Sequence, residues 1–537
     1  MAEWWRGSVT YQVYPRSFQD DNGDGIGDLK GITRRLPYLA DLGVDAVWLS
    51  PIFTSPMLDM GYDVSNYTEV DPVFGTLQDY DDLVAAAHKL GLKVVIDQVL
   101  NHTSDKHPAF VESRSSRDNA KADWYVWHDP NLDGTPPNNW LSVFGGTAWQ
   151  WDARRKQYYF HNFLTQQPDL NFHNPEVQDF HLANMRFWLE RGTDGFRFDT
   201  VNFFFHDKKL RNDAADYRIL EKPEGNPYQM QYHLFSKGQP ENLPWIERIR
   251  ALIDQYDNRS TVGEMGETHH AIRMMGEYTA PGRLNQCYSF EMMGYDYSAA
   301  FFRSRIADFF SGAPDGWPMW AFSNHDVVRH ASRWAKFGVS QDSLARQAGA
   351  LLLSFQGSIC LWEGEEIGQT DTALAFEDLT DPQGINFWPE PVGRDNTRTP
   401  MVWDASEFGG FSTVKPWLPV KAPQLARNVA SQTGVAGSVL EFYRSVIGFR
   451  KGSAALMMGR TVFHDVAEPV LAFTRAAGSD AVLCVFNLSP EGRMLTVEGV
   501  SALVGPVQDA ELTGQTLTVG PNAVAFLTVS GDVKISA

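Results

Sequence analysis

Three acidic residues stand at the ends of three separate short apolar runs. Asp199 ends GFRFD, Glu264 lies in TVGEM and Asp326 ends FSNHD. Carboxyl groups brought together can divide the work of breaking a bond, one as nucleophile and another as general acid and base. Arg197 lies two residues before Asp199, so strand alternation puts both side chains on one face. An arginine there is expected to lower the pKa of Asp199 and keep it ionised, as a nucleophile requires.

The joint pattern carries this interpretation, because each residue alone has a simpler explanation. A single aspartate at a strand end is more often a helix N-cap than a catalyst. His102 and His325 supply imidazole donors suited to sugar hydroxyls, although one isolated histidine is more often structural.

The elements that would position these residues are eight short apolar runs with helical patterns between them. Segments 80–90 and 177–191 have the spacing of amphipathic helices. This alternation predicts an α/β fold closed as a (β/α)8 TIM barrel, with reactive groups at the C-terminal ends of the strands. The runs are residues 9–14, 46–49, 93–99, 195–199, 260–264, 287–290, 319–323 and 358–362.

Two regions depart from the alternation and predict further domains. Residues 103–171, after the third strand, are rich in Pro, Asn, Gly and aromatics and are too long for a plain loop. We interpret them as an inserted small domain. Residues 456–537 alternate at period two, which predicts a C-terminal antiparallel β-domain, a β-sandwich. The barrel then comprises residues 1–102 and 172–455.

Composition limits the partners and the compartment. The 46 Lys and Arg against 66 Asp and Glu give a net charge of −20, which argues against nucleic acid and anionic membrane as partners. No signal-peptide pattern and no apolar run of about 18 residues is present. Three widely spaced cysteines favour a reducing compartment, so we expect a cytoplasmic protein, a monomer or small homo-oligomer.

The motifs resemble those of glycoside hydrolase family 13, the α-amylase family. DQVLNH, GFRFDTVN, TVGEM and FSNHD match its four barrel motifs, and YQVYPRSFQDDNGDGIGDLKGI, QPDLN and GEEIGQ are further matches. Within the family the chain is similar to the α-glucosidase and oligo-1,6-glucosidase group. The resemblance implies Asp199 as nucleophile, Glu264 as general acid/base and Asp326 as transition-state stabiliser.

The resemblance also implies a pocket for one terminal glucose. Asp59 and Arg394 would bind the hydroxyls of its non-reducing end and close the pocket as an ion pair, unless they form only a surface pair. Tyr62 would stack beneath the sugar, Thr200 would border the acceptor, and loop residues 226–242 would form a wall on the acceptor side. The candidate substrate-binding residues are Asp59, Tyr62, His102, Phe144, Phe163, Arg197, Thr200, His325 and Arg394.

An acidic loop near the N-terminus has the oxygen spacing of a Ca²⁺ loop. Asp20, Asn22, Asp24, the carbonyl of Ile26 and Asp28 occupy positions 1, 3, 5, 7 and 9. Position 12 is Gly31 rather than glutamate, so the loop is no EF-hand. The resembling group binds a divalent ion here, which implies structural Ca²⁺ or Mg²⁺ and no organic cofactor. The alternative is a solvated acidic turn.

The expected function is that of an exo-acting retaining α-glucosidase acting on short α-glucosides such as maltose and sucrose. A sugar hydroxyl in place of water would give transglucosylation. The alternatives are an oligo-1,6-glucosidase, a sucrose isomerase or a trehalose-cleaving relative. A rival of another class is a non-catalytic barrel of the transporter heavy-chain type. Those barrels have lost their catalytic carboxylates, whereas all three acids are present here.

Overall fold

A computed structural model describes residues 3–217, 225–267 and 269–536 of the chain. Eight parallel strands form its central sheet, in the order β13-β12-β9-β5-β2-β1-β15-β14. A further parallel bridge between Cys287 and Pro318 joins the two edges and closes the barrel, as predicted. The strands are β1 (Val9–Val13), β2 (Ala46–Leu49), β5 (Lys93–Gln98), β9 (Gly195–Phe198), β12 (Ser260–Met265), β13 (Gln286–Ser289), β14 (Met319–Trp320) and β15 (Ser358–Trp362).

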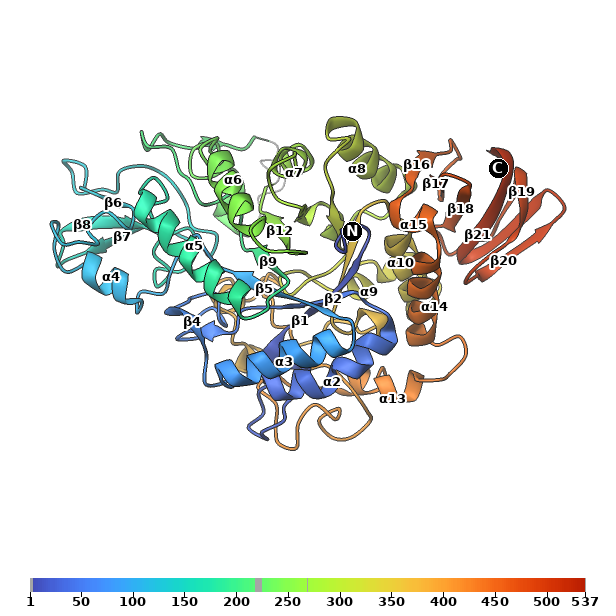
Figure 1. The fold of residues 1–537 in the computed structure, drawn as a ribbon, viewed down its shortest axis with the longest axis horizontal. Helices are drawn as coiled ribbons and strands as arrows, with labels where there is room; N and C mark the ends of the chain where they lie inside the picture. Colours follow the sequence, from blue (N-terminus) through green and yellow to red (C-terminus); the bar gives the residue numbers. More distant parts are fainter. Residues whose placement is uncertain (1–2, 218–224, 268, 537) are drawn as a thin grey trace.

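Helices cover the outside of the barrel (Figure 1). Their starts follow from local sequence: Asp28 caps α2, a Thr76–Asp79 capping box starts α3, and Asn174 caps α5 with Pro175 at its first turn. The main helices are α2 (Leu29–Leu42), α3 (Leu77–Lys89), α5 (Pro175–Glu190), α6 (Asn242–Ile253), α7 (Ala271–Tyr278), α8 (Ala299–Gly312), α10 (Gln341–Ser354) and α14 (Val439–Gly452).

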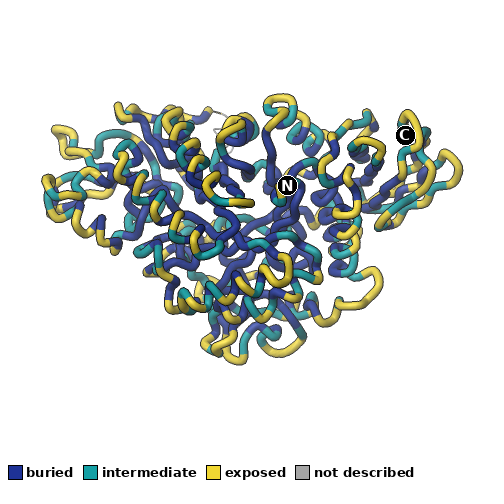
Figure 2. The backbone as a smooth tube through the Cα atoms, in the orientation of Figure 1, coloured by how far each residue is buried: buried dark blue, intermediate teal, exposed yellow. Residues whose placement is uncertain are grey.

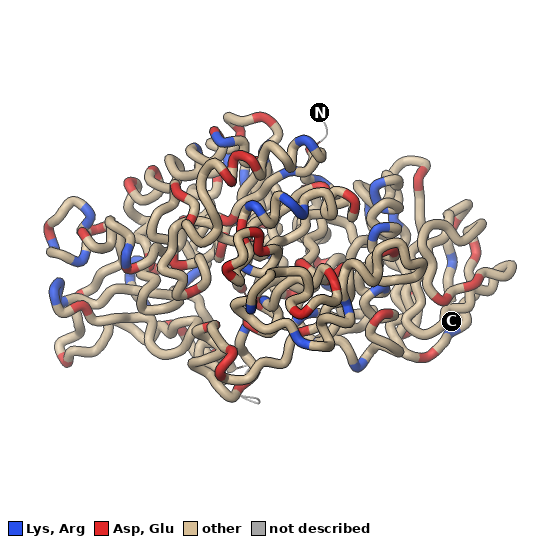
Figure 3. The backbone as a smooth tube through the Cα atoms, turned by 90° about the horizontal axis from the view of Figure 1, so that it is seen from below, with Lys and Arg blue, Asp and Glu red and all other residues tan. Residues whose placement is uncertain are grey.

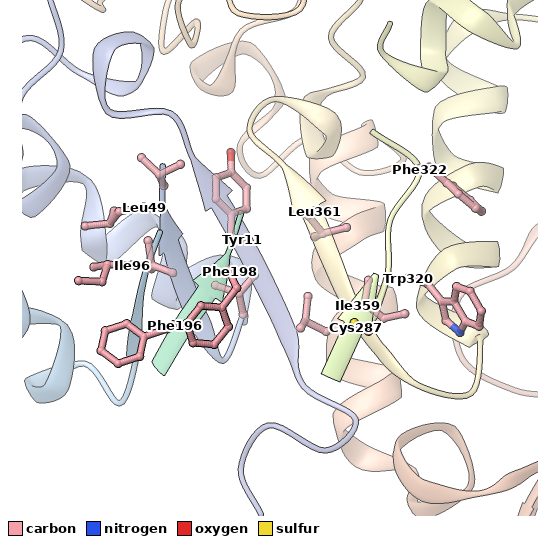
Figure 4. Close-up of a cluster of buried hydrophobic side chains, with 14 of the residues drawn as sticks. Tyr11, Leu49, Ile96, Phe196, Phe198, Cys287, Trp320, Phe322, Ile359 and Leu361 are labelled. Carbon is pink, nitrogen blue, oxygen red and sulfur yellow. The ribbon is translucent and has the colours of Figure 1, made fainter. Parts of the chain in front are cut away.

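Strand alternation divides the barrel side chains between two environments. Phe196 and Phe198 of β9 belong to the large apolar core between strands and helices, part of which Figure 4 shows. Arg197 between them points to the interior of the barrel, where its register partner on β5 is Asp97. The barrel strands are accordingly buried along their length (Figure 2).

The segment after β5 contains a small antiparallel sheet of its own. Its order is β6-β8-β7, from β6 (Trp127–His128), β7 (Trp149–Asp152) and β8 (Gln157–Phe160). Helix α4 (Pro108–Ser113) lies beside it (Figure 1). This subdomain brings residues of segment 143–167 to the mouth of the barrel.

The C-terminal part is a β-domain, as predicted. Strands β16 to β18 pair antiparallel in sequence order, and β21 pairs antiparallel with β18 and β20. Residues of β17, β18, β19 and β21 enclose an apolar cluster separate from the barrel core. The strands are β16 (Arg460–Phe463), β17 (Val470–Ala477), β18 (Asp480–Asn487), β19 (Arg493–Leu503), β20 (Gln508–Thr513) and β21 (Thr516–Ser536).

The distribution of charge and the length of the apolar helices bear on the partners that the protein can have. Lys and Arg positions are spread along the chain in Figure 3 and are interspersed with Asp and Glu. None of the helices in the described ranges is both long enough and apolar enough to cross a membrane.

Candidate active site

The predicted residues converge on one cavity at the C-terminal ends of the barrel strands. Its volume is about 300 Å³, and it is lined by eleven of the twelve predicted catalytic and substrate-binding residues. The twelfth, Arg197, lies beneath it with no exposed surface. The eleven are Asp59, Tyr62, His102, Phe144, Phe163, Asp199, Thr200, Glu264, His325, Asp326 and Arg394.

A single guanidinium joins three carboxylates at the base of the cavity. Arg197 Nη1 donates to Asp97 Oδ1 at 2.6 Å and to Asp199 Oδ1 at 2.9 Å, while its Nη2 lies 2.6 Å from Glu264 Oε1. The sequence predicted the Arg197–Asp199 contact through strand alternation. It did not predict that Asp97 and Glu264 share the same arginine, because that sharing depends on the register of three strands.

Arg197 lowers the pKa of Asp199, as expected, but it does not set the net direction of the shift. Burial raises the pKa of Asp199 well above its ordinary value, and the neighbouring Glu264, Asp97 and Asp326 add to this, although Arg197 opposes it. Burial likewise raises the pKa of Asp97 to about 6. Since three carboxylates share one cation, a proton taken up here would be shared by the cluster rather than assigned to one residue.

Both oxygens of the Glu264 side chain are held. Oε1 accepts a hydrogen bond from the hydroxyl of Tyr288 at 2.9 Å, and Oε2 accepts one from the backbone amide of Thr200 at 3.0 Å. Thr200 has a φ of 41°, which is unusual for a β-branched residue and typical of strain kept at functional sites. Tyr288 was not predicted, although it is the register partner of Glu264 on β13 and therefore faces the same side.

Asp326 has the opposite electrostatic surroundings to Asp199. Its Oδ1 accepts from Arg398 at 2.9 Å and from Arg394 at 3.2 Å, and His325 Nε2 lies 3.2 Å from Oδ2. These neighbours lower the pKa of Asp326 despite its burial, so it stays ionised. A permanent negative charge here suits stabilisation of positive charge developing on a bound sugar.

One end of the cavity is closed by buried ion pairs. Arg394 Nη2 lies 2.8 Å from Asp59 Oδ1 and 2.7 Å from Asp381 Oδ1, and Gln167 Nε2 donates to Asp59 Oδ2 at 3.0 Å. All of these side chains are buried, so the alternative of a surface loop pair is wrong. Asp381 and Gln167 were not predicted for this site, although Gln167 lies in the QPDLN motif.

The two histidines and Tyr62 line the same end as neutral groups. Tyr62 Oη lies 2.7 Å from His325 Nε2 and donates to Asp97 Oδ2 at 3.1 Å, and its ring stacks on His325. Burial lowers the pKa of His102 to about 4 and that of His325 well below its ordinary value. A neutral imidazole can donate a hydrogen bond to a sugar hydroxyl, and the Tyr62 hydroxyl oxygen can accept one, without adding charge.

Aromatic side chains and the loop after β9 form the rest of the wall. Phe144 and Phe163 were predicted, and Phe203 and Phe290 also line the cavity. From the predicted loop 226–242, the lining residues are Tyr228, Gln229, Gln231, His233 and Lys237. Burial lowers the pKa of Lys237 to about 8, although Glu267 and Asp213 oppose the shift. These two additional phenylalanines and Lys237 were not singled out from the sequence.

The five predicted metal ligands lie outside this cavity, in the loop that precedes α2. The carboxylates of Asp20 and Asp28 each accept from backbone amides of the loop, and Asp24 accepts from the amide of Ile26. Within the described residues, no group of three or more His, Cys, Asp or Glu is arranged as a metal site. In the same part of the chain, none of these three carboxylates joins an ion pair, whereas Asp21 pairs with Arg34.

The chain matches known proteins along most of its length. Residues 12–459 match the family model described as alpha amylase, catalytic domain. A probable alpha-glucosidase of Rhizobium meliloti (strain 1021) is 54% identical over 91% of this chain and 90% of its own length. An oligo-1,6-glucosidase of Heyndrickxia coagulans is 38% identical over 91% of this chain and 93% of its own.

A solved structure shares the fold closely. The crystal structure of the alpha-glucosyl transfer enzyme XgtA superposes with a TM-score of 0.95 at 50% identity, covering 98% of this chain and all of that one. The site geometry, the family match and these relatives agree, and the chain belongs to the α-amylase family of glycoside hydrolases.

Proposed function

We propose that the protein is an exo-acting, retaining α-glucosidase that removes terminal, α-1,4-linked glucose from short α-glucosides such as maltose and sucrose. The observation that carries this proposal is the buried ion pairs of Arg394 with Asp59 and Asp381 at one end of the cavity, which would block a sugar chain there. In this proposal the substrate enters with its non-reducing end first, and these groups bind the hydroxyls of the terminal glucose. The similarity to a probable alpha-glucosidase supports the same activity.

The contacts of Asp199 assign its attacking oxygen. Oδ1 is held by Arg197, whereas the one hydrogen bond to Oδ2 from the described residues is a long contact of 3.3 Å with Thr200 Oγ1. Oδ2 is thus free to bond the anomeric carbon while a proton from Glu264 passes to the leaving oxygen, giving a glycosyl ester. Water then attacks the same carbon, Glu264 takes its proton, and the ester breaks. Two inversions give net retention.

The number of protons that the site can hold is compatible with these two reaction steps. The first step needs Asp199 ionised and Glu264 protonated, which is one proton on the pair. Three buried carboxylates around one guanidinium favour holding at least one proton near neutral pH. A glucosyl unit that contacts Asp199 would direct that proton to Glu264.

Transglucosylation is the second activity that we propose. The acceptor side of the cavity carries polar side chains of Tyr228, Gln231 and Lys237 that can bind a hydroxyl compound in place of water. The similarity to an alpha-glucosyl transfer enzyme at 50% identity supports this activity. The oligo-1,6-glucosidase alternative rests on relatives with lower identity.

Two measurements test the proposal. NMR in the first minutes of hydrolysis should show α-glucose before mutarotation, and early β-glucose would overturn the double displacement. A panel of maltose, isomaltose, sucrose, trehalose and maltotriose should give free glucose most rapidly from maltose. Preference for isomaltose would favour the oligo-1,6-glucosidase reading, and conversion of sucrose to an isomeric disaccharide would favour a sucrose isomerase.

We further propose that the loop from Asp20 to Asp28 binds Ca²⁺ or Mg²⁺ in a structural role. The spacing of its oxygens supports this proposal, and so does the fact that Asp20, Asp24 and Asp28 form no ion pair within the described residues. Added Ca²⁺ or Mg²⁺ should raise the melting temperature relative to protein in EDTA, and Asp24→Asn should reduce the response. Equal melting temperatures would identify the loop as a solvated acidic turn.

The cytoplasm is the compartment that we propose, and a monomer or small homo-oligomer is the proposed assembly. The support for a reducing compartment is that Cys287, Cys360 and Cys484 are all buried free thiols. Light scattering after size-exclusion chromatography would measure the assembly. Cell fractionation would test the compartment.

A further inference from the structure

Tyr288 lies beneath the cavity, between Arg197 and Glu264. It is 2% exposed, sits on β13 as the register partner of Glu264, and is absent from the cavity lining. Its hydroxyl oxygen accepts from Arg197 Nε at 3.2 Å and from Arg197 Nη2 at 2.9 Å. A guanidinium has no acceptor, so the one phenolic hydrogen of Tyr288 must go elsewhere.

That hydrogen goes to Glu264. Tyr288 Oη donates to Glu264 Oε1 at 2.9 Å, and Arg197 Nη2 lies 2.6 Å from the same oxygen. Protonation of Oε1 would place a third hydrogen against these two donors. Among the residues that the structure describes, the one hydrogen-bond donor to Oε2 is the backbone amide of Thr200, a residue that lines the cavity. The two oxygens of Glu264 therefore differ in their ability to carry a proton.

We propose that Tyr288 is a positioning residue that keeps Oε1 of Glu264 engaged, so that the transferable proton is carried on Oε2. This inference rests on the proposed role of Glu264 as general acid and base. In the first step the proton leaves Oε2 for the glycosidic oxygen, which keeps the electron pair of the breaking C–O bond. In the second step water bonds the same carbon and returns a proton to Oε2, and the electron pair of the ester bond returns to Asp199.

The pH consequence follows from the groups that face Glu264. These are Arg197 and Asp199 on and after β9, Asp97 on β5 and Tyr288 on β13, with Asp326 after β14 across the cavity. Tyr288→Phe removes one donor to the ionised form of Glu264 and leaves every formal charge in place. The acid form should then persist to higher pH.

The test compares Tyr288→Phe with Tyr297→Phe. Tyr297 is also buried and its hydroxyl makes one hydrogen bond, to Gln347 Oε1 at 2.7 Å, away from the cavity. In Tyr288→Phe the alkaline limb of kcat/KM should move up by about one pH unit, the effect expected of one hydrogen bond to a carboxylate. Because the proton is no longer confined to Oε2, activity on maltose should fall about tenfold relative to p-nitrophenyl α-glucoside, whose leaving group needs little acid help.

The outcomes separate this inference from the proposed function. If Tyr288→Phe matches Tyr297→Phe in both the pH profile and the substrate ratio, the role of Tyr288 is wrong. If Glu264→Gln still hydrolyses maltose at an appreciable rate, the proposed function itself fails. Should Tyr288→Phe not fold, 3-fluorotyrosine at position 288 keeps the shape and donates more strongly. The alkaline limb should then move to lower pH, and an unchanged limb would overturn the inference.

Discussion

The two ends of the cavity are built on different physical principles. At the closed end, Arg394 makes ion pairs with Asp59 and Asp381, and Gln167 donates to Asp59. At the acceptor end, uncharged polar groups and phenylalanine rings form most of the wall, and the charged side chains of the buried Lys237 and of Glu267 also line the cavity. Directional contacts recognise one set of hydroxyl positions, whereas flat apolar walls accept many shapes. We infer that the enzyme is strict toward the glucosyl donor and permissive toward the acceptor.

The ion pairs at the closed end serve recognition more than stability. Desolvating a buried arginine and two carboxylates costs about as much as their attraction returns, whereas breaking such a group by removing one partner is strongly destabilising. Arg197 is likewise buried, but it is paired with three carboxylates, so it keeps two partners when one of them is removed. The catalytic carboxylates and the closed end that binds the donor sugar are therefore both held in place by buried ion pairs.

The largest expected effect on activity comes from replacing the nucleophile Asp199, which both hydrolysis and transfer require. Asp199→Asn cannot form the glycosyl ester, so hydrolysis and transfer should fall together, by about 10⁴-fold. Because burial raises the pKa of Asp199, its charge is held at a cost, and the melting temperature should stay near the wild-type value or rise. Steady-state kinetics and calorimetry measure both. Retention of more than one-hundredth of the activity would contradict the nucleophile assignment.

Breaking the closed end should come next in size. Arg394→Met leaves Asp59 and Asp381 buried without their cation, and kcat/KM for maltose should fall about 10²- to 10³-fold. The ratio of transfer to hydrolysis should stay constant, because the acceptor end is untouched. Arg248→Met is the control, since the Arg248–Asp179 pair is largely exposed. A loss of less than tenfold would mean that this end does not select the donor.

Substitution of Thr200, which lies between the two ends, should have a smaller effect, limited to the preference between α-1,4 and α-1,6 linkages. The family resemblance implies a role for Thr200 in linkage selection, because members of the resembling group that favour α-1,4 bonds typically have Thr at this position and members that favour α-1,6 bonds typically have Val. Val matches the shape of Thr but removes the hydroxyl, so Thr200→Val should raise kcat/KM for isomaltose relative to maltose by about tenfold, within the range for small pocket differences. Both residues are β-branched, so the backbone at φ 41° is equally strained in both. An unchanged ratio would move attention to the loop 226–242.

Site residues at the ends of strands with a regular residue pattern could be predicted from the sequence. Contacts that depend on the register between strands, or on how deeply a side chain is buried, could not. Asp199, Glu264 and Asp326 were found because each ends a strand-like run, and barrel strands end at one face. Tyr288 lies in a run typical of a core strand, and only its pairing with Glu264 shows its contact. The sign of the pKa shift of Asp199 was missed because burial depth is a tertiary property.

Site residues in irregular segments were also difficult to predict from the sequence. The closed barrel followed from alternation alone, but Asp381, which pairs with Arg394, lies in a segment without periodicity that the sequence did not place at the site. Lys237 lies in the loop predicted as the acceptor-side wall, but nothing in the sequence singled it out within that loop. The loop from Asp20 to Asp28 shows the limit in a further way. Residue spacing gives the ligand types, whereas the direction of each oxygen depends on hydrogen bonds to the loop's own amides.

The smallest expected effect sharpens the acceptor end. Lys237 Nζ donates to Gly266 O at 2.7 Å, which leaves two of its three hydrogens for an acceptor hydroxyl. Its pKa of about 8 means that it loses its charge as the pH rises from 7 to 9. The ratio of transfer to hydrolysis should fall a few-fold over this range. In Lys237→Met the ratio should be low at every pH, with hydrolysis of p-nitrophenyl α-glucoside reduced less than transfer. Lys106→Met, an exposed lysine, controls for general charge loss. If Lys237→Met keeps the wild-type ratio and its pH dependence, Lys237 has no part in binding the acceptor.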